Sequence, residues 1–234
     1  ISVMSSTPNN NEFVAGINWT SDVLVADVYD GSVSLQDAIQ EALAYAGQTG
    51  QKVVFQGGIQ GESWLTNGGS QQELEAILAA SEATAVYAVA AGNGGVEVDH
   101  IPDPGEDRKE SGGVARLQAA HNNVIAVGAM QREQEMVDGL ANALDVKRAE
   151  YANYGHGVTL TGATDSRATY QFTGIDSPQF GQSNTTQSFG GTSAANPNMA
   201  AIASLTWSMN VGLAGSDTPE ILTDTAMKDL PDFI

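Results

Sequence analysis

The sequence predicts a three-layer α/β fold with a mainly parallel sheet. Short β-rich segments alternate along the chain with helical segments, which is the pattern of strand–helix–strand units. The segment Val124–Ala129 is apolar on both faces, as expected of a buried parallel strand. Glycines and short polar turns separate these elements, and we find no internal repeat or interdomain linker. We therefore expect a single domain over residues 1–234.

Each predicted helix, strand and loop rests on a local pattern in the sequence. Ser34 is positioned to cap a helix over Leu35–Ala46, whose apolar residues recur at helical spacing, and Gly47 is expected to end it. A second helix is expected over 71–81 and a third over Ala194–Met209. The predicted strands are Val23–Tyr29, Lys52–Phe55, Ala85–Ala91 and Val124–Ala129. The expected loops are 5–12 and 95–113, and irregular structure is expected from the last strand to about Phe189.

Composition excludes several classes of protein. The chain has 234 residues, of which 41% are hydrophobic, which suits a globular domain, and no apolar run is long enough for a membrane span. Nine Lys and Arg against 28 Asp and Glu give a formal charge of −19, which disfavours a nucleic-acid surface. The absence of Cys excludes disulfides, zinc–thiolate sites and a cysteine nucleophile.

The segment from Gly191 to Pro197, Gly-Thr-Ser-Ala-Ala-Asn-Pro, places Ser193 at the start of the last predicted helix. A helix start offers unpaired N–H groups and partial positive charge, which favour an oxyanion forming beside a serine hydroxyl. The alternative is that Thr192 or Ser193 simply caps the helix.

A second polar residue follows another predicted strand. Asn93 comes after the apolar strand that ends in Val-Ala-Ala-Gly, at the edge of the sheet where α/β folds bind ligands. Its carboxamide is suited to complete an oxyanion hole with the Ser193 N–H. The alternative is a turn-forming Asn-Gly pair.

Together these segments resemble the subtilisin-like serine proteases. Ala91-Gly92-Asn93 resembles the family's oxyanion motif, Asn123–Ala129 its buried strand, Ala152–Gly155 its "S-N-[YF]-G" turn, Gly191–Pro197 its nucleophile motif and Val14–Gly16 the end of its histidine helix. The resemblance runs from about Asn10 to Met209 and implies a subtilisin-like fold.

The resemblance implies roles for particular residues. Ser193 is expected to be the nucleophile and Asn93 the oxyanion-hole side chain. Ala90, Ala91 and Gly92 are expected to line the primary specificity pocket, and Phe55-Gln56-Gly57 occupies the place of the substrate-pairing strand, with Phe55 a departure from the usual "S-L-G". The family's calcium loop after "V-A-G" looks deleted, because only Ile17–Asp22 precede the next strand; we assign no metal ligand and no cofactor.

No residue of this chain matches the catalytic His or the catalytic Asp of the family. Asn10 falls where the family has its catalytic His, and His100, His121 and His156 lie at positions that do not match it. Nine residues precede Asn10, so the strand bearing the Asp is expected outside this chain, on an upstream segment or a second chain. The fold is accordingly expected to lack its N-terminal part here and to need that segment for stability and activity.

The leading hypothesis is the nucleophile-bearing portion of a secreted, extracellular or periplasmic serine endopeptidase that hydrolyses peptide bonds through an acyl-enzyme on Ser193. One alternative is a catalytically inactive domain of the same fold, a binding or structural module, favoured by Asn10. A second is an unrelated nucleotide-binding protein using the glycines of residues 57–61, although that segment has no P-loop Lys.

We predict that moderate salt stabilises the protein. The carboxylates are spread along the sequence, so a charge of −19 repels itself over a solvated surface, and screening relieves that repulsion. The melting temperature should rise between low and moderate NaCl concentration. A flat or falling melting temperature would contradict this interpretation of the acidic composition.

Overall fold

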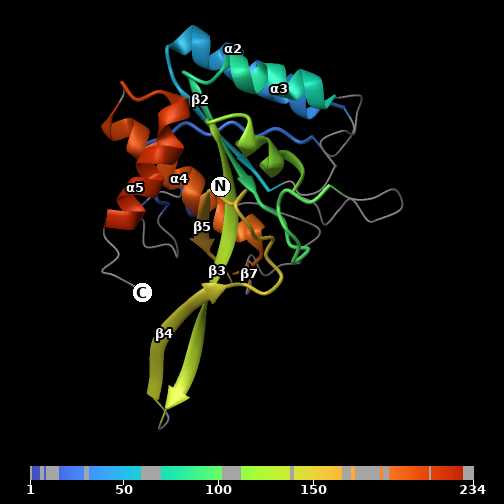
Figure 1. Ribbon diagram of the computed structural model, residues 1–234. Helices are drawn as coiled ribbons and strands as arrows, with labels where there is room; N and C mark the ends of the chain where they lie inside the picture. Colours follow the sequence, from blue (N-terminus) through green and yellow to red (C-terminus); the bar gives the residue numbers. More distant parts are fainter. Residues whose placement is uncertain are drawn as a thin grey trace.

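The computed structural model describes residues 2–5, 8, 16–28, 32–58, 70–101, 112–137, 140–164, 170–171, 185–186, 190–210 and 212–228. A central sheet is covered on one face by α2 (Leu35–Thr49), α3 (Gln71–Ala80) and the 3-10 helix η2 (Gly113–Ala119) (Figure 1). The other face is covered by α4 (Thr192–Met209). The predicted α/β class is therefore confirmed.

The sheet is built from β1 (Val53–Gly57), β2 (Ala85–Ala90), β3 (Val124–Val137), β4 (Leu140–Arg148) and β5 (Leu160–Ala163). β1 pairs with β2, β2 with β3 and β3 with β5, all in parallel. Their carboxyl ends therefore lie along one edge of the sheet. β1 is the last strand on its side of the described sheet.

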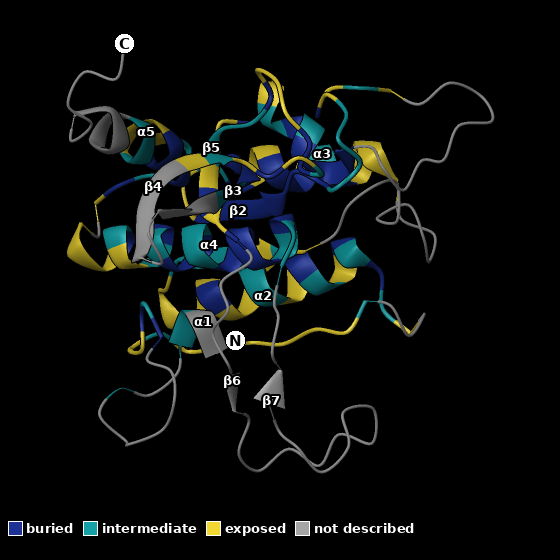
Figure 2. Ribbon diagram, turned by 90° about the horizontal axis from the view of Figure 1, so that it is seen from below, coloured by how far each residue is buried: buried dark blue, intermediate teal, exposed yellow. Residues whose placement is uncertain are grey.

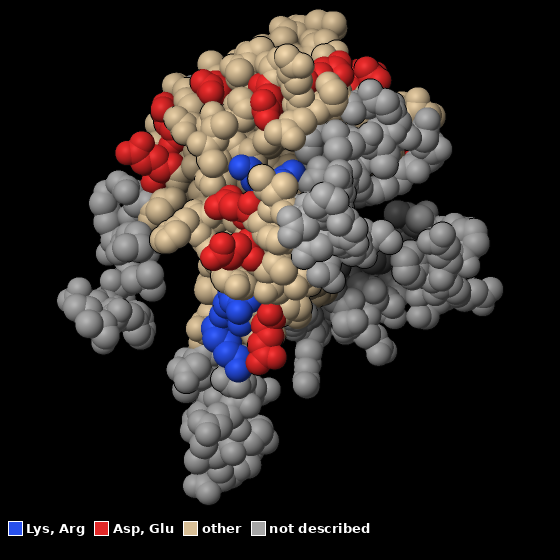
Figure 3. Space-filling view, turned by 45° about the vertical axis from the view of Figure 1, so that its right-hand side comes forward, with Lys and Arg blue, Asp and Glu red and all other residues tan. Residues whose placement is uncertain are grey.

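The outer part of β3 and the whole of β4 form an antiparallel hairpin that projects from the body (Figure 1). The expectation of irregular structure after Ala129 was wrong here. The sequence carried a hairpin signal that we did not use, the Asp138-Gly139 pair between two strand-like runs. In Figure 3, acidic side chains are spread over the visible face of the body, and basic ones gather where the hairpin leaves it.

Helix α2 begins at the predicted residue but ends later than predicted. The Ser34 hydroxyl accepts from the Asp37 N–H at 3.0 Å and caps the start, as predicted. The helix continues through Gly47, however, and ends at Gly50, which has a φ of 68°. Of these two glycines, only Gly50 adopts the left-handed conformation that closes a helix, so the boundary predicted at Gly47 was wrong.

The strand predicted over Val23–Tyr29 is not formed in the described residues 23–28, and Tyr29 lies outside them. The side chains of Leu24 and Val25 are 60% and 73% exposed. A β-rich sequence becomes a strand only where a neighbouring edge and a buried face are available. Among the described residues no strand pairs with this segment.

The remaining elements lie around this frame. They are α1 (Ser2–Ser5), which packs on α4, the short strands β6 (Tyr170–Gln171) and β7 (Thr185–Thr186), the 3-10 helix η3 (Gly215–Asp217) and α5 (Thr218–Lys228). Helix α5 was not predicted from the sequence, although Pro219 in its first turn is a helix-start signal. Most of the loops expected at 5–12 and 95–113 lies outside the described residues.

Two apolar clusters fill the space on either side of the sheet. Figure 2 shows buried residues along β2 and on α4. On the α2–α3 side, the rings of Phe55 and Tyr87 stack with centroids 4.7 Å apart. The Tyr87 hydroxyl lies 2.7 Å from the Ser81 hydroxyl, and burial raises the pKa of Tyr87 to about 12. Phe55 therefore contributes its side chain to the core of the domain.

Gly162 in β5 allows α4 to lie close to the sheet, because a Cβ at this position would be 2.6 Å from the carbonyl oxygen of Ala195. We predict that Gly162→Ala destabilises the protein by about 1–3 kcal/mol, since the helix backbone would have to move. The matched substitution Gly47→Ala meets nothing within 4 Å and should stabilise the exposed face of α2 by about 0.5–1 kcal/mol. Denaturant unfolding measures both, and changes of the same sign would contradict the account.

Candidate active site

The amino-terminal part of α4 is fixed to β1 and β2 by a buried side chain. Asn196, which is fully buried, donates from Nδ2 to the carbonyl oxygens of Gly57 at 2.8 Å and Ala88 at 3.1 Å. Gly191 caps the helix with a φ of 79°, and a Cβ there would lie 3.2 Å from the Asn93 amide nitrogen. Both the conformation and the close contact require glycine at this position.

Ser193 is the second residue of α4 and is partly exposed. Its Oγ lies beside the end of β1, 3.6 Å from where a Cβ of Gly58 would stand. Within the described part of the chain, neither the hydroxyl nor the backbone N–H of Ser193 has a hydrogen-bond partner. The N–H is one of the donors that the start of a helix leaves unpaired.

Asn93 follows β2 and contacts the residue before Ser193. Its Oδ1 accepts from the backbone N–H of Thr192 at 2.9 Å and from the Thr192 hydroxyl at 3.0 Å. With Oδ1 held by two donors, the orientation of the carboxamide is set, and Nδ2 lies on the other side of Cγ. The structure thus brings together the two residues predicted to be catalytic.

The loop that carries Asn93 is held by Asn153 from the turn after β4. The Asn153 Oδ1 accepts from the N–H groups of Gly94 at 2.9 Å and Val96 at 3.2 Å, and its Nδ2 donates to the Ala91 carbonyl at 2.8 Å. Arg148 donates to three carbonyls of that turn, those of Ala149, Glu150 and Ala152. These hydrogen bonds show that the turn containing Asn153 holds the loop that carries Asn93, a role that the sequence did not reveal.

The residues predicted to bind substrate lie at the same edge of the sheet. Gln56 is exposed and Gly57 is half-buried at the end of β1, whereas Phe55 directs its ring into the core. Ala90, Ala91 and Gly92 are buried behind Asn93, and the Gly92 N–H donates to the Thr192 hydroxyl at 3.3 Å. Because the Phe55 ring is partly buried against Tyr87, Phe55 offers a ligand chiefly its main chain.

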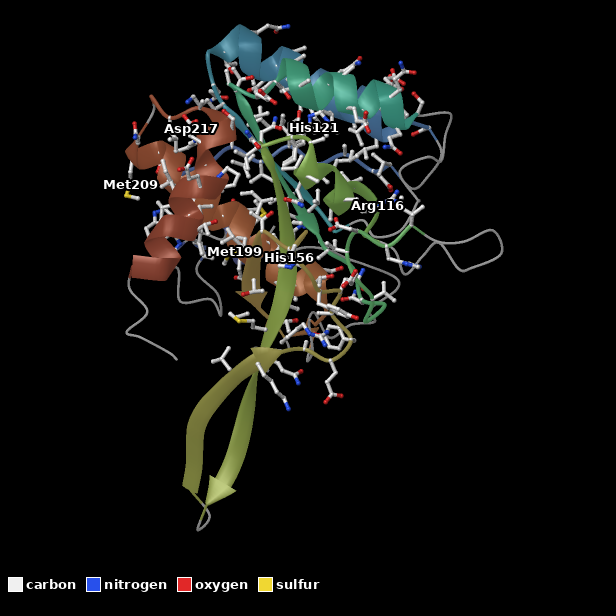
Figure 4. All side chains as sticks on the ribbon, viewed as in Figure 1. Arg116, His121, His156, Met199, Met209 and Asp217 are labelled. Atoms are coloured by element: carbon white, nitrogen blue, oxygen red, sulfur yellow. The ribbon has the colours of Figure 1, made fainter. Side chains whose placement is uncertain are left out.

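Among the described residues, no histidine hydrogen-bonds to Ser193. His121 lies beside the start of β3 (Figure 4), at the opposite end of the parallel strands from Ser193. His156 is exposed, and His100 follows the isolated bridge at Glu97. Asn10 lies outside the described residues, within which no cluster of three or more His, Cys, Asp or Glu forms a candidate metal site.

Sequence reasoning missed three groups around Ser193. Asn196 was an unassigned position within the Gly191–Pro197 motif. Tyr151, which contacts Gly191, directly precedes the Ala152–Gly155 motif but is not part of it, and Thr164, which also contacts Gly191, lies in a segment for which no motif was identified. An Asn within an otherwise apolar helix indicates hydrogen bonds to other segments, because buried amide N–H groups are usually hydrogen-bonded. No local pattern indicates the other two.

The fold and the placement of Ser193 and Asn93 define the class of protein as a subtilisin-like α/β protein. The sequence profile of the Subtilase family, Peptidase_S8, matches residues 2–233, and the chain belongs to this family. The sequence matches no curated protein. Family membership favours the protease-related hypotheses over the nucleotide-binding one.

Solved structures share this fold. The chain is similar to "S41 Psychrophilic Protease", with a TM-score of 0.57 and 18% identity over 95% of this chain and 66% of that one. It is also similar to "Sphericase", with a TM-score of 0.50 and 19% identity over 81% of this chain. The matched part spans 53% of the Sphericase chain, about half its length.

Proposed function

We propose that this chain is the nucleophile-bearing portion of a serine endopeptidase and that residues 1–234 belong to one catalytic domain. The observation that carries the proposal is the position of Ser193, which opens α4 beside the end of β1 and one residue from the Thr192–Asn93 contact. Its Oγ would attack the scissile carbonyl, the amine would leave, and water would then hydrolyse the acyl-enzyme.

The oxyanion of the tetrahedral intermediate would be stabilised by Asn93 Nδ2 and the Ser193 N–H. Support comes from the fixed orientation of the Asn93 carboxamide and from the unpaired N–H at the start of α4, within the described residues. Donors that are already oriented need no reorganisation when charge develops on the substrate oxygen.

The substrate is proposed to be a polypeptide that adds to the carboxyl end of β1 as an extra strand. Main-chain groups of Phe55, Gln56 and Gly57 would pair with it, and the segment 90–92 would form one wall of the pocket for the side chain at the cleaved bond. The support is the position of β1 as the last described strand, with Gln56 exposed and Ser193 beside its end.

The general base and the Asp that orients it are proposed to come from a complementary segment, either upstream in the same polypeptide or on a second chain. Within the described residues no His hydrogen-bonds to Ser193, the outer edge of β1 has no neighbouring strand, and Leu24 and Val25 are exposed. A strand inserted between Val23–Val28 and the amino half of β1 would pair that edge and cover those side chains.

A catalytically inactive domain that serves as a binding or structural module is the second candidate, favoured by Asn10 at the expected His position. Peptidase assays of the chain alone and together with the complementary segment separate the two candidates, because the inactive domain stays inactive in both.

We also propose a secreted or periplasmic location. No helix in the described part of the chain is long and apolar enough to cross a membrane.

We predict that a serine-directed fluorophosphonate labels Ser193 in the complemented enzyme. Ser193→Ala should abolish labelling and remove most peptidase activity, because the nucleophile is lost. Mass spectrometry of the labelled peptide gives the site, and Ser208→Ala, at an exposed position near the end of α4, is the matched control. Labelling at another residue, or full activity in Ser193→Ala, would overturn the assignment.

We predict that Asn93→Ala lowers kcat by about 10²–10³-fold with little change in KM, because its amide is used mainly in the transition state. Steady-state kinetics on a peptide substrate measure both constants. An effect on KM alone would instead identify Asn93 as a ground-state binding residue.

A further inference from the structure

The residue that caps α4 is held by side chains from two other segments. The Gly191 N–H donates to the Tyr151 hydroxyl at 3.1 Å, and the Thr164 hydroxyl donates to the Gly191 carbonyl at 2.8 Å. The two hydroxyl oxygens are 3.3 Å apart. Both backbone polar groups of Gly191 are therefore bound by hydroxyl groups.

The direction of each hydrogen bond follows from the groups involved. An N–H only donates and a carbonyl oxygen only accepts. Since Thr164 gives its one proton to the Gly191 carbonyl, the hydroxyl of Tyr151 donates to Thr164 Oγ1. The three residues form a closed ring, and within this ring each hydroxyl donates once and accepts once. Such chains of hydrogen bonds polarise and strengthen one another.

The ring connects the cap of α4 to segments anchored on β3. Thr164 directly follows β5, is buried, and donates its own backbone N–H to the Met130 carbonyl at 2.9 Å. Tyr151 lies in the turn after β4 and packs against the apolar cluster on the α4 side of the sheet. Gly191 is thus fixed from the β3–β5 side, while Asn196 fixes the same helix from the β1–β2 side.

We propose that Tyr151 and Thr164 are positioning residues for the nucleophile and for the oxyanion donor, a proposal that rests on the function proposed for Ser193. Gly191 precedes Thr192, which holds the Asn93 carboxamide, and Ser193 comes next. A shift of Gly191 therefore moves both reacting groups together. A displacement of about 1 Å at a reacting centre costs on the order of 100-fold in rate.

The ring makes a specific prediction about isosteric variants. Tyr151→Phe and Thr164→Val each remove one hydroxyl and break two of the ring's three bonds. Each should lower kcat by about 10- to 100-fold with KM nearly unchanged. The double variant should be only slightly worse than the worse single variant, because both substitutions disrupt one unit. Thr164→Ser keeps the hydroxyl and should retain kcat.

Matched controls lie close by. Tyr154→Phe removes a hydroxyl on the same turn, where the Tyr154 ring lies against Arg148, and Thr161→Val makes the same change at an exposed position of β5. Both controls should leave kcat unchanged. The kinetics are measured on the complemented enzyme, and fluorophosphonate labelling rates give a second measure of Ser193 reactivity.

Amide hydrogen exchange tests the ring without reference to activity. Exchange of the Gly191 and Thr192 amides should be faster in Tyr151→Phe and Thr164→Val than in the controls, with the core amides of β2 unchanged. Unchanged exchange at Gly191, or unchanged kcat with Ser193 still labelled, would overturn the proposal. If Ser193 is never labelled in the unmutated protein, the proposed function fails, and the exchange rates still decide whether the ring holds Gly191 and Thr192.

Discussion

The close approach of α4 to the carboxyl ends of the parallel strands is the constraint on which the site depends. The approach is possible because Gly162 has no side chain beneath Ala195, and it is fixed because Asn196 bonds to both β1 and β2. The helix start is thereby directed at the edge of the sheet, with Ser193 next to Gly58. The position of Ser193 thus follows from the close packing of α4 on β5 and from the hydrogen bonds of the Asn196 side chain.

The polar groups around the helix start are organised before any substrate arrives. Asn93 is oriented by Thr192, and the loop that carries it is bound at four points by Asn153, from both its side chain and its backbone. Buried amide groups of this kind are stable only when their hydrogen bonds are made. The same hydrogen bonds therefore also hold the geometry of the proposed oxyanion site in place.

The sequence predicted the features that depend on local pattern. Short stretches of sequence encode the α/β class, the buried strands, the cap at Ser34 and the serine at the start of α4. Prediction of a strand failed at Val23–Val28, where no described strand lies beside the segment. The end of α2 was misplaced for a local reason, because two glycines lie close together and only the second, Gly50, adopts the left-handed conformation. The bonds of Asn196, Tyr151 and Thr164 join segments far apart in the chain, so no window of sequence contains them.

The central claim is that the first turn of α4 and Asn93 together form an oxyanion site around Ser193. A crystal structure of the complemented enzyme bearing a phosphonyl group on Ser193 Oγ tests it most directly. The account predicts a phosphonyl oxygen within about 3 Å of both Asn93 Nδ2 and the Ser193 backbone nitrogen. A phosphonyl group whose oxygens face solvent, with Asn93 bonded elsewhere, would contradict it.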